Sequence, residues 1–278
     1  MSTVALITGA ASGIGAAVAR RLSAGGVKCV LVDLDGEGAE RLAKEVDGVW
    51  LAADVSAEES SLEAVALAER RYGRLDLVHL NAGIAGRVDL ANFDLDRYRE
   101  VVGVNVDGVV FGVRASVPLL KRSGGGAIVV TASLAGLVGF AGDPIYTMTK
   151  HAVVGLVRAL AEPLAADNIR IGAVCPGFTD TPLVAEAREM FVNAGFPCSP
   201  PRTWPPPSRP PFTPRRPALF SSSSRDGSRC RTVMPECPVQ RAVSGRHTHN
   251  DGKWLASRTP TVMKGLGCRP ALARWRAL

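Results

Sequence analysis

Residues 4–15 read VALITGAASGIG, an apolar run followed directly by a glycine-rich loop. The run Val4–Thr8 has the length and composition of a buried strand, and the residues from Ala16 onward predict a helix. Glycines permit a tight turn between the two and let the backbone approach a ligand closely. The helix would then point its free N–H groups and the positive end of its dipole at a diphosphate. The stretch therefore predicts a dinucleotide-binding strand–loop–helix unit.

Apolar runs and helical patterns continue to alternate as far as residue 174. The expected strands are Val4–Thr8, Cys29–Asp33, Val49–Ala53, Leu75–Leu80, Ala127–Ala132 and Ile169–Val174. The expected helices are Ala16–Ala24, Glu37–Val46, Leu62–Tyr72, Arg97–Lys121 and Tyr146–Asp167. Strands that are apolar throughout, with helices between them, predict a parallel sheet covered on both faces. The predicted fold class is therefore α/β, a Rossmann-like doubly wound parallel sheet.

The composition of the chain changes near residue 195. Residues 1–195 hold 18 Lys and Arg against 23 Asp and Glu, whereas residues 196–278 hold 15 against 3. The second segment also carries 14 of the 19 prolines and four of the six cysteines, without a sustained helical or strand period. We therefore predict one domain over residues 1–195 and a basic, Pro/Arg/Ser-rich tail over residues 196–278 that is disordered.

Three explanations of the tail stay open: a basic arm for nucleic acid, a proline-rich interaction segment, and translation in the wrong frame. The first lacks a recognisable module, and Trp204, Trp254 and Trp275 are scattered. The second has only loose Pro-x-x-Pro matches. If the segment from Cys198 onward is written in GC-rich codons and translated in a frame shifted by one base, the resulting sequence contains an acidic helix start, an alanine-rich helix and an apolar strand. We therefore favour a one-base frameshift near Pro197–Cys198.

Two acidic residues end predicted strands beside the glycine loop. Asp33 lies 18 residues after Gly15, where a carboxylate can accept hydrogen bonds from the adenosine ribose and would repel a 2′-phosphate. No Lys or Arg lies beside it, so NAD is favoured over NADP; the alternative is a solvated loop aspartate. Asp54 and Val55 end the third strand, where a side chain could reach the adenine, although Asp54 could equally cap a turn.

Six further features follow at characteristic positions: Thr8-Gly9-x-x-x-Gly13-x-Gly15, Asn81-Ala82-Gly83, Asn105, Ser133, Tyr146-x-x-x-Lys150 and Pro176-Gly177. Together, over about residues 3–190, they resemble the short-chain dehydrogenase/reductase family. One departure is Leu80, where the family more often has asparagine, and we expect it to have little effect on function. The expected cofactor-binding residues are Gly9, Ser12, Gly13, Ile14, Gly15, Asp33, Asp54, Val55, Asn81, Ala82, Gly83, Tyr146, Lys150, Pro176, Gly177 and Thr179.

The pair Tyr146 and Lys150 predicts acid/base chemistry, because residues four apart share a helix face. A free tyrosine has a pKa of about 10, and a neighbouring ammonium together with a charged nicotinamide would lower it. Tyr146 could then take the proton of an alcohol or give one to a carbonyl. Taken singly, such residues form surface pairs, strand-end caps or exposed amides. Four of them in register with the glycine loop favour the catalytic interpretation.

The resemblance implies more specific roles for several of these residues. Lys150 would also bind the nicotinamide ribose, and Ser133 would orient the substrate oxygen. Asn105 would hold a water in a proton relay to Lys150, and Thr179 would bond the nicotinamide carboxamide. The family's sheet also has a seventh strand. A frameshift would remove it and leave Ile169–Val174 as an exposed apolar edge, with reduced stability and weak turnover.

The expected function is that of an NAD-dependent oxidoreductase that interconverts a secondary alcohol and a ketone. The alternative is a non-catalytic nucleotide-binding remnant with a basic interaction tail. We expect a cytoplasmic protein with reduced thiols, without a signal peptide, membrane segment, nucleic-acid partner or metal site. His79 and His151 are predicted to be structural. The family usually forms homodimers or homotetramers through the two long helices.

Overall fold

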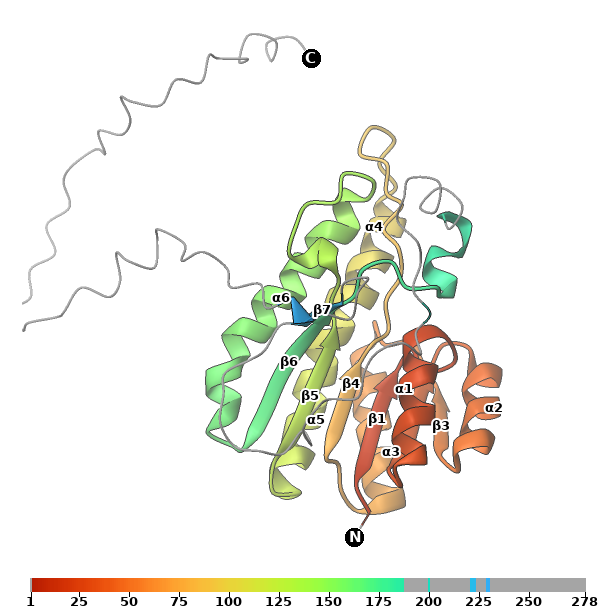
Figure 1. Ribbon diagram of the computed structural model, residues 1–278, viewed down its shortest axis with the longest axis vertical. Coiled ribbons are helices and arrows are strands. Elements are labelled where there is room, and N and C mark those ends of the chain that lie inside the picture. The colour runs from red at the N-terminus through yellow and green to blue at the C-terminus, as the bar shows by residue number, and fades with distance from the viewer. Residues whose placement is uncertain (1, 188–199, 201–220, 224–228, 231–278) are drawn as a thin grey trace, which may run out of the picture. The chain divides into compact units, whose positions relative to one another are not determined.

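The computed structural model of the protein describes residues 2–187, 200, 221–223 and 229–230 (Figure 1). The chain separates into two compact units, Met1–Thr232 and Val233–Leu278. The second unit lies outside the described residues, and so does the predicted domain boundary at residue 195. Most of the predicted tail, residues 196–278, also lies outside the described residues, and there its disorder stays a prediction; residues 221–223 and 229–230 of the tail form strands.

Strands and helices alternate along the first unit as the sequence predicts. The first six strands are β1 (Val4–Thr8), β2 (Lys28–Asp33), β3 (Val49–Ala52), β4 (Leu77–Leu80), β5 (Gly126–Thr131) and β6 (Ile169–Cys175). The α-helices are α1 (Gly13–Ala24), α2 (Gly36–Val46), α3 (Glu58–Tyr72), α4 (Leu95–Val102), α5 (Gly108–Arg122) and α6 (Pro144–Ala165). These strands pair in parallel in the order β3-β2-β1-β4-β5-β6. The predicted Rossmann-like parallel sheet is confirmed.

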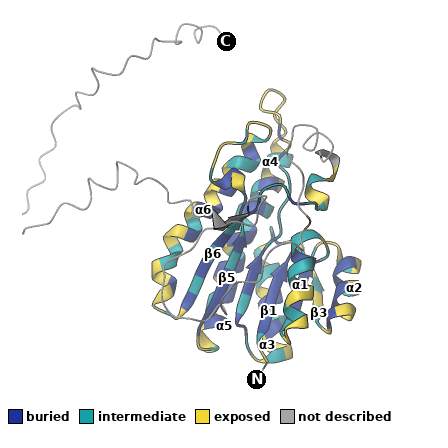
Figure 2. Cartoon of the chain, in the orientation of Figure 1, coloured by how far each residue is buried: buried dark blue, intermediate teal, exposed yellow. Residues whose placement is uncertain are grey.

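Two hydrophobic clusters hold helices against opposite faces of the sheet. The larger cluster joins α3, α5 and α6 to the sheet, through residues such as Leu6, Val78 and Leu119. The smaller cluster joins α1 and α2 to β1 and β2, through residues such as Ile7 and Leu31. Figure 2 shows buried residues along the strands and exposed residues on the outer sides of the helices. Helices therefore cover both faces of the sheet at β1 and β2.

The two faces of β6 are buried to different extents. Ile169, Ile171, Ala173 and Cys175 are buried, whereas the three residues between them are only half-buried. In Figure 1, α1 lies in front of the β1 side of the sheet, but no described helix lies in front of β5 and β6. Such alternation is typical of a sheet with one covered face. Among the described helices none covers this face of β6, so the predicted cover concerns residues outside the described part and stays a prediction.

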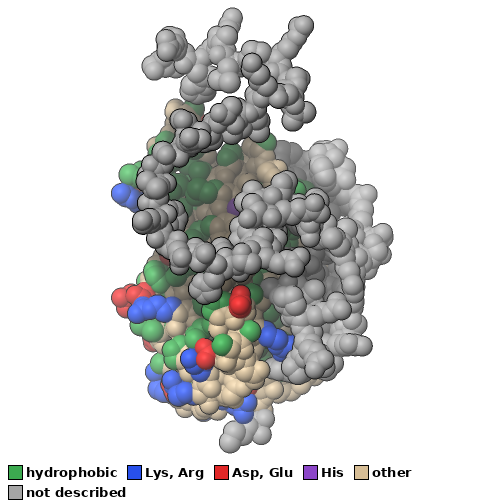
Figure 3. Space-filling view, turned by 90° about the vertical axis from the view of Figure 1, so that its left-hand side faces the viewer, with side chains coloured by type: hydrophobic (Ala, Val, Ile, Leu, Met, Phe, Trp, Pro, Cys, Tyr) green, Lys and Arg blue, Asp and Glu red, His purple; other side chains and the backbone are tan. Residues whose placement is uncertain are grey.

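The edge of the sheet beyond β6 also differs from the prediction of a missing last strand. A short strand, β7 (Ser221–Ser223), pairs in parallel with Val174 and Cys175, and β8 (Arg229–Cys230) pairs with β7 in the antiparallel sense. Among the described residues, pairing on this side of β6 is confined to those two positions. Figure 3 turns this side of the molecule toward the viewer, and many of the visible charged side chains gather in its lower half.

The predicted helix Arg97–Lys121 is interrupted by one π-helical turn. This turn, η1 (Gly103–Asp107), joins α4 to α5, so that Leu95–Arg122 forms one helical segment. The segment is long and apolar enough to cross a membrane by length and composition. However, Val113, Leu119 and Leu120 pack in the larger core cluster. This packing is that of a helix that covers the sheet of a globular domain.

The half-buried second face of β6 and its pairing with β7 at only two described positions yield a test of the frameshift hypothesis. We compare this chain with one whose residues after Pro197 follow the shifted frame. We expect the shifted chain to have a Tm higher by about 10 °C, since each kcal/mol of added unfolding free energy raises Tm by about 2–4 °C in chains of this size. Differential scanning calorimetry measures the difference. A third chain with residues 198–278 in scrambled order controls for composition. Equal Tm values for the shifted and printed chains would contradict the hypothesis.

Candidate active site

The glycine loop between β1 and α1 needs a glycine at three positions. Gly9 and Gly13 have φ angles of 62° and 54°, in the left-handed region that side chains disfavour. A Cβ at Gly9 would also lie 2.8 Å from Ala82 Cα, and one at Gly15 would collide with the Gly9 carbonyl oxygen. Ser12 is the N-cap of α1 but makes no side-chain capping bond. The first-turn amides, those of Gly13 to Gly15, can therefore serve a bound anion.

Asn81 fixes this loop from the end of β4. Its Nδ2 donates to the carbonyl oxygens of Thr8 and Gly9, both at 3.1 Å. The backbone N–H groups of Asn81 and Ala82 donate to Thr8 Oγ1 at 2.9 and 3.1 Å. The Asn81-Ala82-Gly83 motif thus lies beside the glycine loop, as predicted, and its side chain shapes the loop.

Thr131, at the end of β5, connects Asn81 to Lys150. Its Oγ1 donates to Asn81 Oδ1 at 3.0 Å, and its carbonyl oxygen accepts from Lys150 Nζ at 3.0 Å. In the sequence, the only signal of this role of Thr131 is a polar residue at a strand end. His79 Nε2 lies 2.9 Å from Thr131 Oγ1, and burial lowers the pKa of His79 to about 4. His79 is therefore a neutral structural residue, as predicted.

The carboxylate of Asp33 lies against the glycine loop. Its Oδ2 accepts from the Ala11 N–H at 2.8 Å, and its Oδ1 accepts from the Asp35 N–H at 2.9 Å. Each carboxylate oxygen has a second lone pair, so Asp33 can still accept a hydrogen bond from a ligand hydroxyl. The sequence analysis did not predict its role in holding the loop.

Asp54 adopts the alternative role that the sequence left open. Its Oδ1 accepts from the N–H and the hydroxyl of Ser56, at 2.9 and 2.7 Å, in the turn before α3. Asp54 therefore caps a turn in the chain as described. Val55 is buried and packs against Gly108 of α5. The contact is close: a Cβ on Gly108 would lie 3.0 Å from Val55 Cγ2. The predicted contact of these two residues with an adenine remains a prediction.

Tyr146, Lys150 and Ser133 meet beside the ends of β5 and β6. Lys150 Nζ lies 5.4 Å from the centroid of the Tyr146 ring, one helical turn along α6. Ser133 begins the 3₁₀ turn η2 (Leu134–Gly136), where its Oγ accepts from the Ala135 N–H at 3.1 Å. A hydrogen bond between Ser133 and Tyr146 favours the phenolate. The structure therefore brings the predicted acid/base pair and the predicted orienting serine together.

Burial dominates the acid strength of both groups in the pair. It raises the pKa of Tyr146 to about 12, with the Asp143 carboxylate acting in the same direction and the Ser133 hydrogen bond acting against it. Burial also lowers the pKa of Lys150 to about 8. Both shifts have the same cause, because removal of water disfavours the phenolate and the ammonium alike. The predicted lowering of the tyrosine pKa needs the charged nicotinamide as well as Lys150, so it stays a prediction.

Asn105 lies in the π-helical turn η1 and is fully buried. Its Oδ1 accepts from the Ile84 N–H at 2.9 Å, and its Nδ2 donates to the Ile84 carbonyl at 2.9 Å and to Thr149 Oγ1 at 3.1 Å. A Cβ on Gly83 would lie 3.3 Å from both Asn105 Oδ1 and Lys150 Nζ. Asn105 is thus close to the predicted pair, while the predicted relay water remains a prediction. Such π-turns occur often at functional sites.

The loop after β6 returns to the glycine loop. The Pro176 carbonyl accepts from the Leu134 N–H at 2.9 Å, and the hydroxyl of the buried Thr179 donates to the Gly177 carbonyl at 3.4 Å. Thr181 was not singled out by the sequence analysis. Its Cγ2 lies 3.1 Å from the position of a Cβ on Gly13.

Comparison with known proteins identifies the same part of the chain. Residues 3–191 match the family model described as short chain dehydrogenase. The chain is 40% identical over 192 residues to cyclohexanol dehydrogenase of Acinetobacter sp. (strain SE19), covering 67% of this chain and 76% of that one. It is 38% identical over 197 residues to levodione reductase of Leifsonia aquatica, covering 68% of this chain and 73% of that one.

Solved structures agree with these sequence matches. A crystal structure of 3-ketoacyl-(acyl-carrier-protein) reductase from Brucella melitensis, complexed with NADH, superposes with a TM-score of 0.68 at 35% identity. The match covers 72% of this chain and 86% of that one.

The depressed pKa of Lys150 predicts how stability depends on pH. An unfolded lysine titrates near pH 10.4, so between about pH 8 and 10 the unfolded chain binds more protons and stability rises with pH. We expect the free energy of unfolding of the wild type to rise relative to Lys150→Met by about 2 kcal/mol from about pH 7.5 to 9.5. Urea titrations at both pH values measure this difference. Relative to Lys121→Met, which removes an exposed lysine, the free energy of unfolding of the wild type should show no such rise. Parallel pH dependences of the wild type and Lys150→Met would refute the prediction.

Proposed function

This chain belongs to the short-chain dehydrogenase family, and we propose that it is an NAD-dependent oxidoreductase that interconverts a secondary alcohol and a ketone. Tyr146 is the proposed proton donor and acceptor. The relatives named above include a dehydrogenase of cyclohexanol and a reductase of levodione, which supports a small alcohol or ketone as the substrate.

One observation carries the proposal: Tyr146 and Lys150 share a face of α6 directly beside the glycine loop. Lys150 Nζ reaches Thr131 O, and Thr131 Oγ1 reaches Asn81, which holds the loop. Hydrogen bonding between Ser133 and Tyr146 places an orienting hydroxyl beside the phenol. A proton-transfer group, a buried cation and a nucleotide cradle are thus within one connected network.

The residues of the cradle fit a dinucleotide. Gly9 and Gly13 hold the left-handed backbone conformations that the tight loop needs, and the first turn of α1 presents amide groups with no side-chain cap. Asp33 offers carboxylate lone pairs to a ribose diol, and the following segment, residues 34–38, carries no Lys or Arg to neutralise a 2′-phosphate. These features support NAD as the preferred cofactor.

Bound NAD would supply the hydride acceptor for alcohol oxidation and, when reduced, the hydride donor for ketone reduction. In this mechanism, Tyr146 Oη takes the proton of the alcohol hydroxyl, or returns one to the ketone oxygen. Ser133 Oγ orients that same oxygen. Lys150 keeps its ammonium next to the phenol, where a positive charge favours the phenolate form.

Replacement of Tyr146 tests the catalytic assignment. We expect Tyr146→Phe to lower kcat about a thousandfold, because the only proton-transfer group of the proposed mechanism is lost. NADH affinity should stay within about twofold of the wild type. A spectrophotometric assay at 340 nm with a panel of secondary alcohols, and NADH fluorescence titration, measure the two quantities. Tyr98→Phe, on α4, is the matched control, and Tyr146→Phe with wild-type kcat would exclude Tyr146 as the acid/base.

Replacement of Asp33 tests the cofactor preference. We expect the wild type to favour NAD over NADP, and Asp33→Ser to shift the ratio of kcat/KM values toward NADP by about tenfold or more, because the repelling carboxylate is lost. Asp35→Ser is the control, since Asp35 caps α2 through Gly38 N and serine preserves such a cap. A wild-type preference for NADP, or equal shifts in both variants, would contradict the role of Asp33.

A further inference from the structure

The backbone that follows β4, residues 84–87, is held by the side chains of Asn105, Arg97 and Asp143. Asn105 binds both polar backbone groups of Ile84. Arg97, on α4, donates from Nη2 to the Ala85 carbonyl at 2.6 Å and from Nε to the Gly86 carbonyl at 3.1 Å. This segment begins directly after Gly83, which lies against Lys150 Nζ. Its conformation therefore decides how the chain passes the reacting groups.

Asp143 holds the next part of the same segment. Its Oδ2 accepts from the N–H groups of Gly86 and Arg87, at 2.8 and 3.1 Å. Its Oδ1 accepts from the Tyr146 N–H at 3.0 Å, so Asp143 is also the N-cap of α6. One carboxylate thus binds the segment after β4 with one oxygen and the first turn of the catalytic helix with the other. Hydrogen bonds from amides to a charged acceptor are stronger than those between neutral groups.

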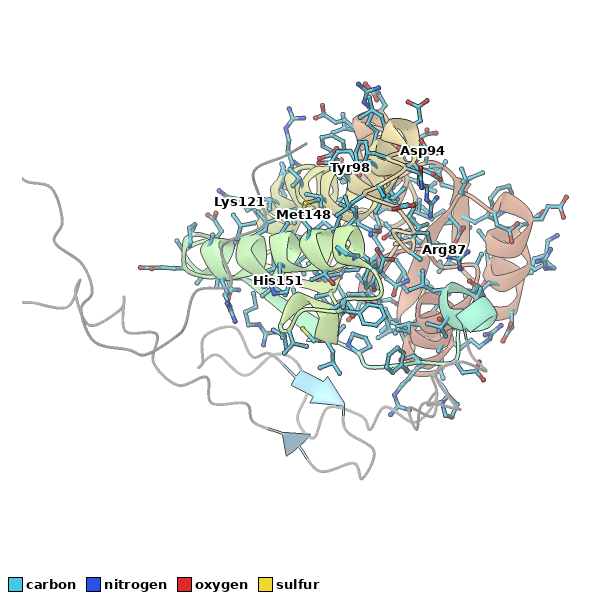
Figure 4. The ribbon with its side chains drawn as sticks, turned by 90° about the horizontal axis from the view of Figure 1, so that it is seen from above. Arg87, Asp94, Tyr98, Lys121, Met148 and His151 are labelled. Carbon is cyan, nitrogen blue, oxygen red and sulfur yellow. The ribbon has the colours of Figure 1, made fainter. Side chains whose placement is uncertain are left out.

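The two elements joined by Asp143 are in direct contact. A Cβ on Gly86 would lie 2.8 Å from the Tyr146 backbone nitrogen and would collide with Asp143 Oδ1. Arg87, labelled on this loop in Figure 4, has a φ of 50°, in the left-handed region. A non-glycine residue keeps such a conformation where its surroundings fix it, and the bond from Arg87 N–H to Asp143 is one such constraint.

We propose that Asp143 is a positioning residue that fixes the segment Ile84–Arg87 against the first turn of α6, and so sets the substrate against the Tyr146 hydroxyl. The inference rests on the proposed function, because it assigns this segment to the wall of the substrate site. Asp143 positions both elements through their backbone N–H groups, and its negative charge in addition disfavours the phenolate of Tyr146. It needs no contact with the substrate or the cofactor, and its loss should therefore affect the alcohol much more than NAD.

Asp143→Asn separates the two bonds of the carboxylate. The amide oxygen can still cap α6, since asparagine is a good N-cap, but the NH₂ group cannot accept from Gly86 and Arg87. We expect kcat/KM for the alcohol to fall about ten- to a hundredfold, because the hydrogen bonds from the Gly86 and Arg87 N–H groups to a charged acceptor are both lost. The fall should appear mainly as a higher KM for the alcohol, with KM for NAD within about twofold.

Asp94→Asn is the matched control. The exposed Asp94, labelled in Figure 4, caps α4 by accepting from Asp96 and Arg97 N–H groups, with the same chemistry and no bond to the loop. Gly86→Ala is a second, independent variant, because its methyl group must push the loop away from Asp143. We expect it to reproduce the KM pattern of Asp143→Asn. Equal effects of Asp143→Asn and Asp94→Asn, or equal rises in both KM values, would overturn the proposal.

Amide hydrogen exchange tests the same contact without turnover. In the full chain, the Gly86 and Arg87 amides should exchange at least about tenfold faster in Asp143→Asn than in the wild type. Their exchange rates in Asp94→Asn should equal those of the wild type. Unchanged exchange in Asp143→Asn would overturn the role of Asp143 whatever the activity. A wild type that protects these amides yet oxidises no alcohol would instead contradict the proposed function, and the loop contact would stand.

Discussion

Thr131 ends β5 and uses both of its polar groups to hold the two halves of the site together. Its hydroxyl donates to Asn81, whose amide holds the carbonyls of Thr8 and Gly9, and its carbonyl accepts from Lys150. The cofactor loop and the catalytic helix α6 are thus fixed to one point of the sheet. In a buried site a polar group without a partner is costly, so this network favours one arrangement of its members.

The same principle orders the segment after β4. Arg97 and Asn105 come from one helical segment and Asp143 precedes α6, and each of them binds backbone groups within residues 84–87. This segment has no ladder of its own, so side chains supply the partners that a sheet or helix would provide. The π-helical turn around Asn105 is what places one of these side chains in the interior, and it occurs where the long helix passes the site.

The acid/base pair depends on the same enclosure. Burial moves the pKa of Tyr146 upward and that of Lys150 downward, since a buried site disfavours both the phenolate and the ammonium. Proximity of two residues on a helix face does not by itself make a base. The charge that favours the phenolate must outweigh desolvation, and in the proposed mechanism the oxidised cofactor adds to the charge of Lys150.

The sequence by itself determined the alternation of β1 to β6 with helices, the glycine loop, and the positions of Tyr146, Lys150 and Ser133. These features are local: periodicity, turn chemistry and a four-residue spacing are visible in a short stretch of chain. The tertiary structure decided the half-buried second face of β6, the short β7 and the loop contact of Asp33. It also decided the roles of Thr131, Thr181 and Asp143. Their partners lie on other elements, at distances of about 50 residues or more for Thr131 and Asp143, and a hydrogen bond between remote residues leaves no pattern in the sequence until the fold brings them together.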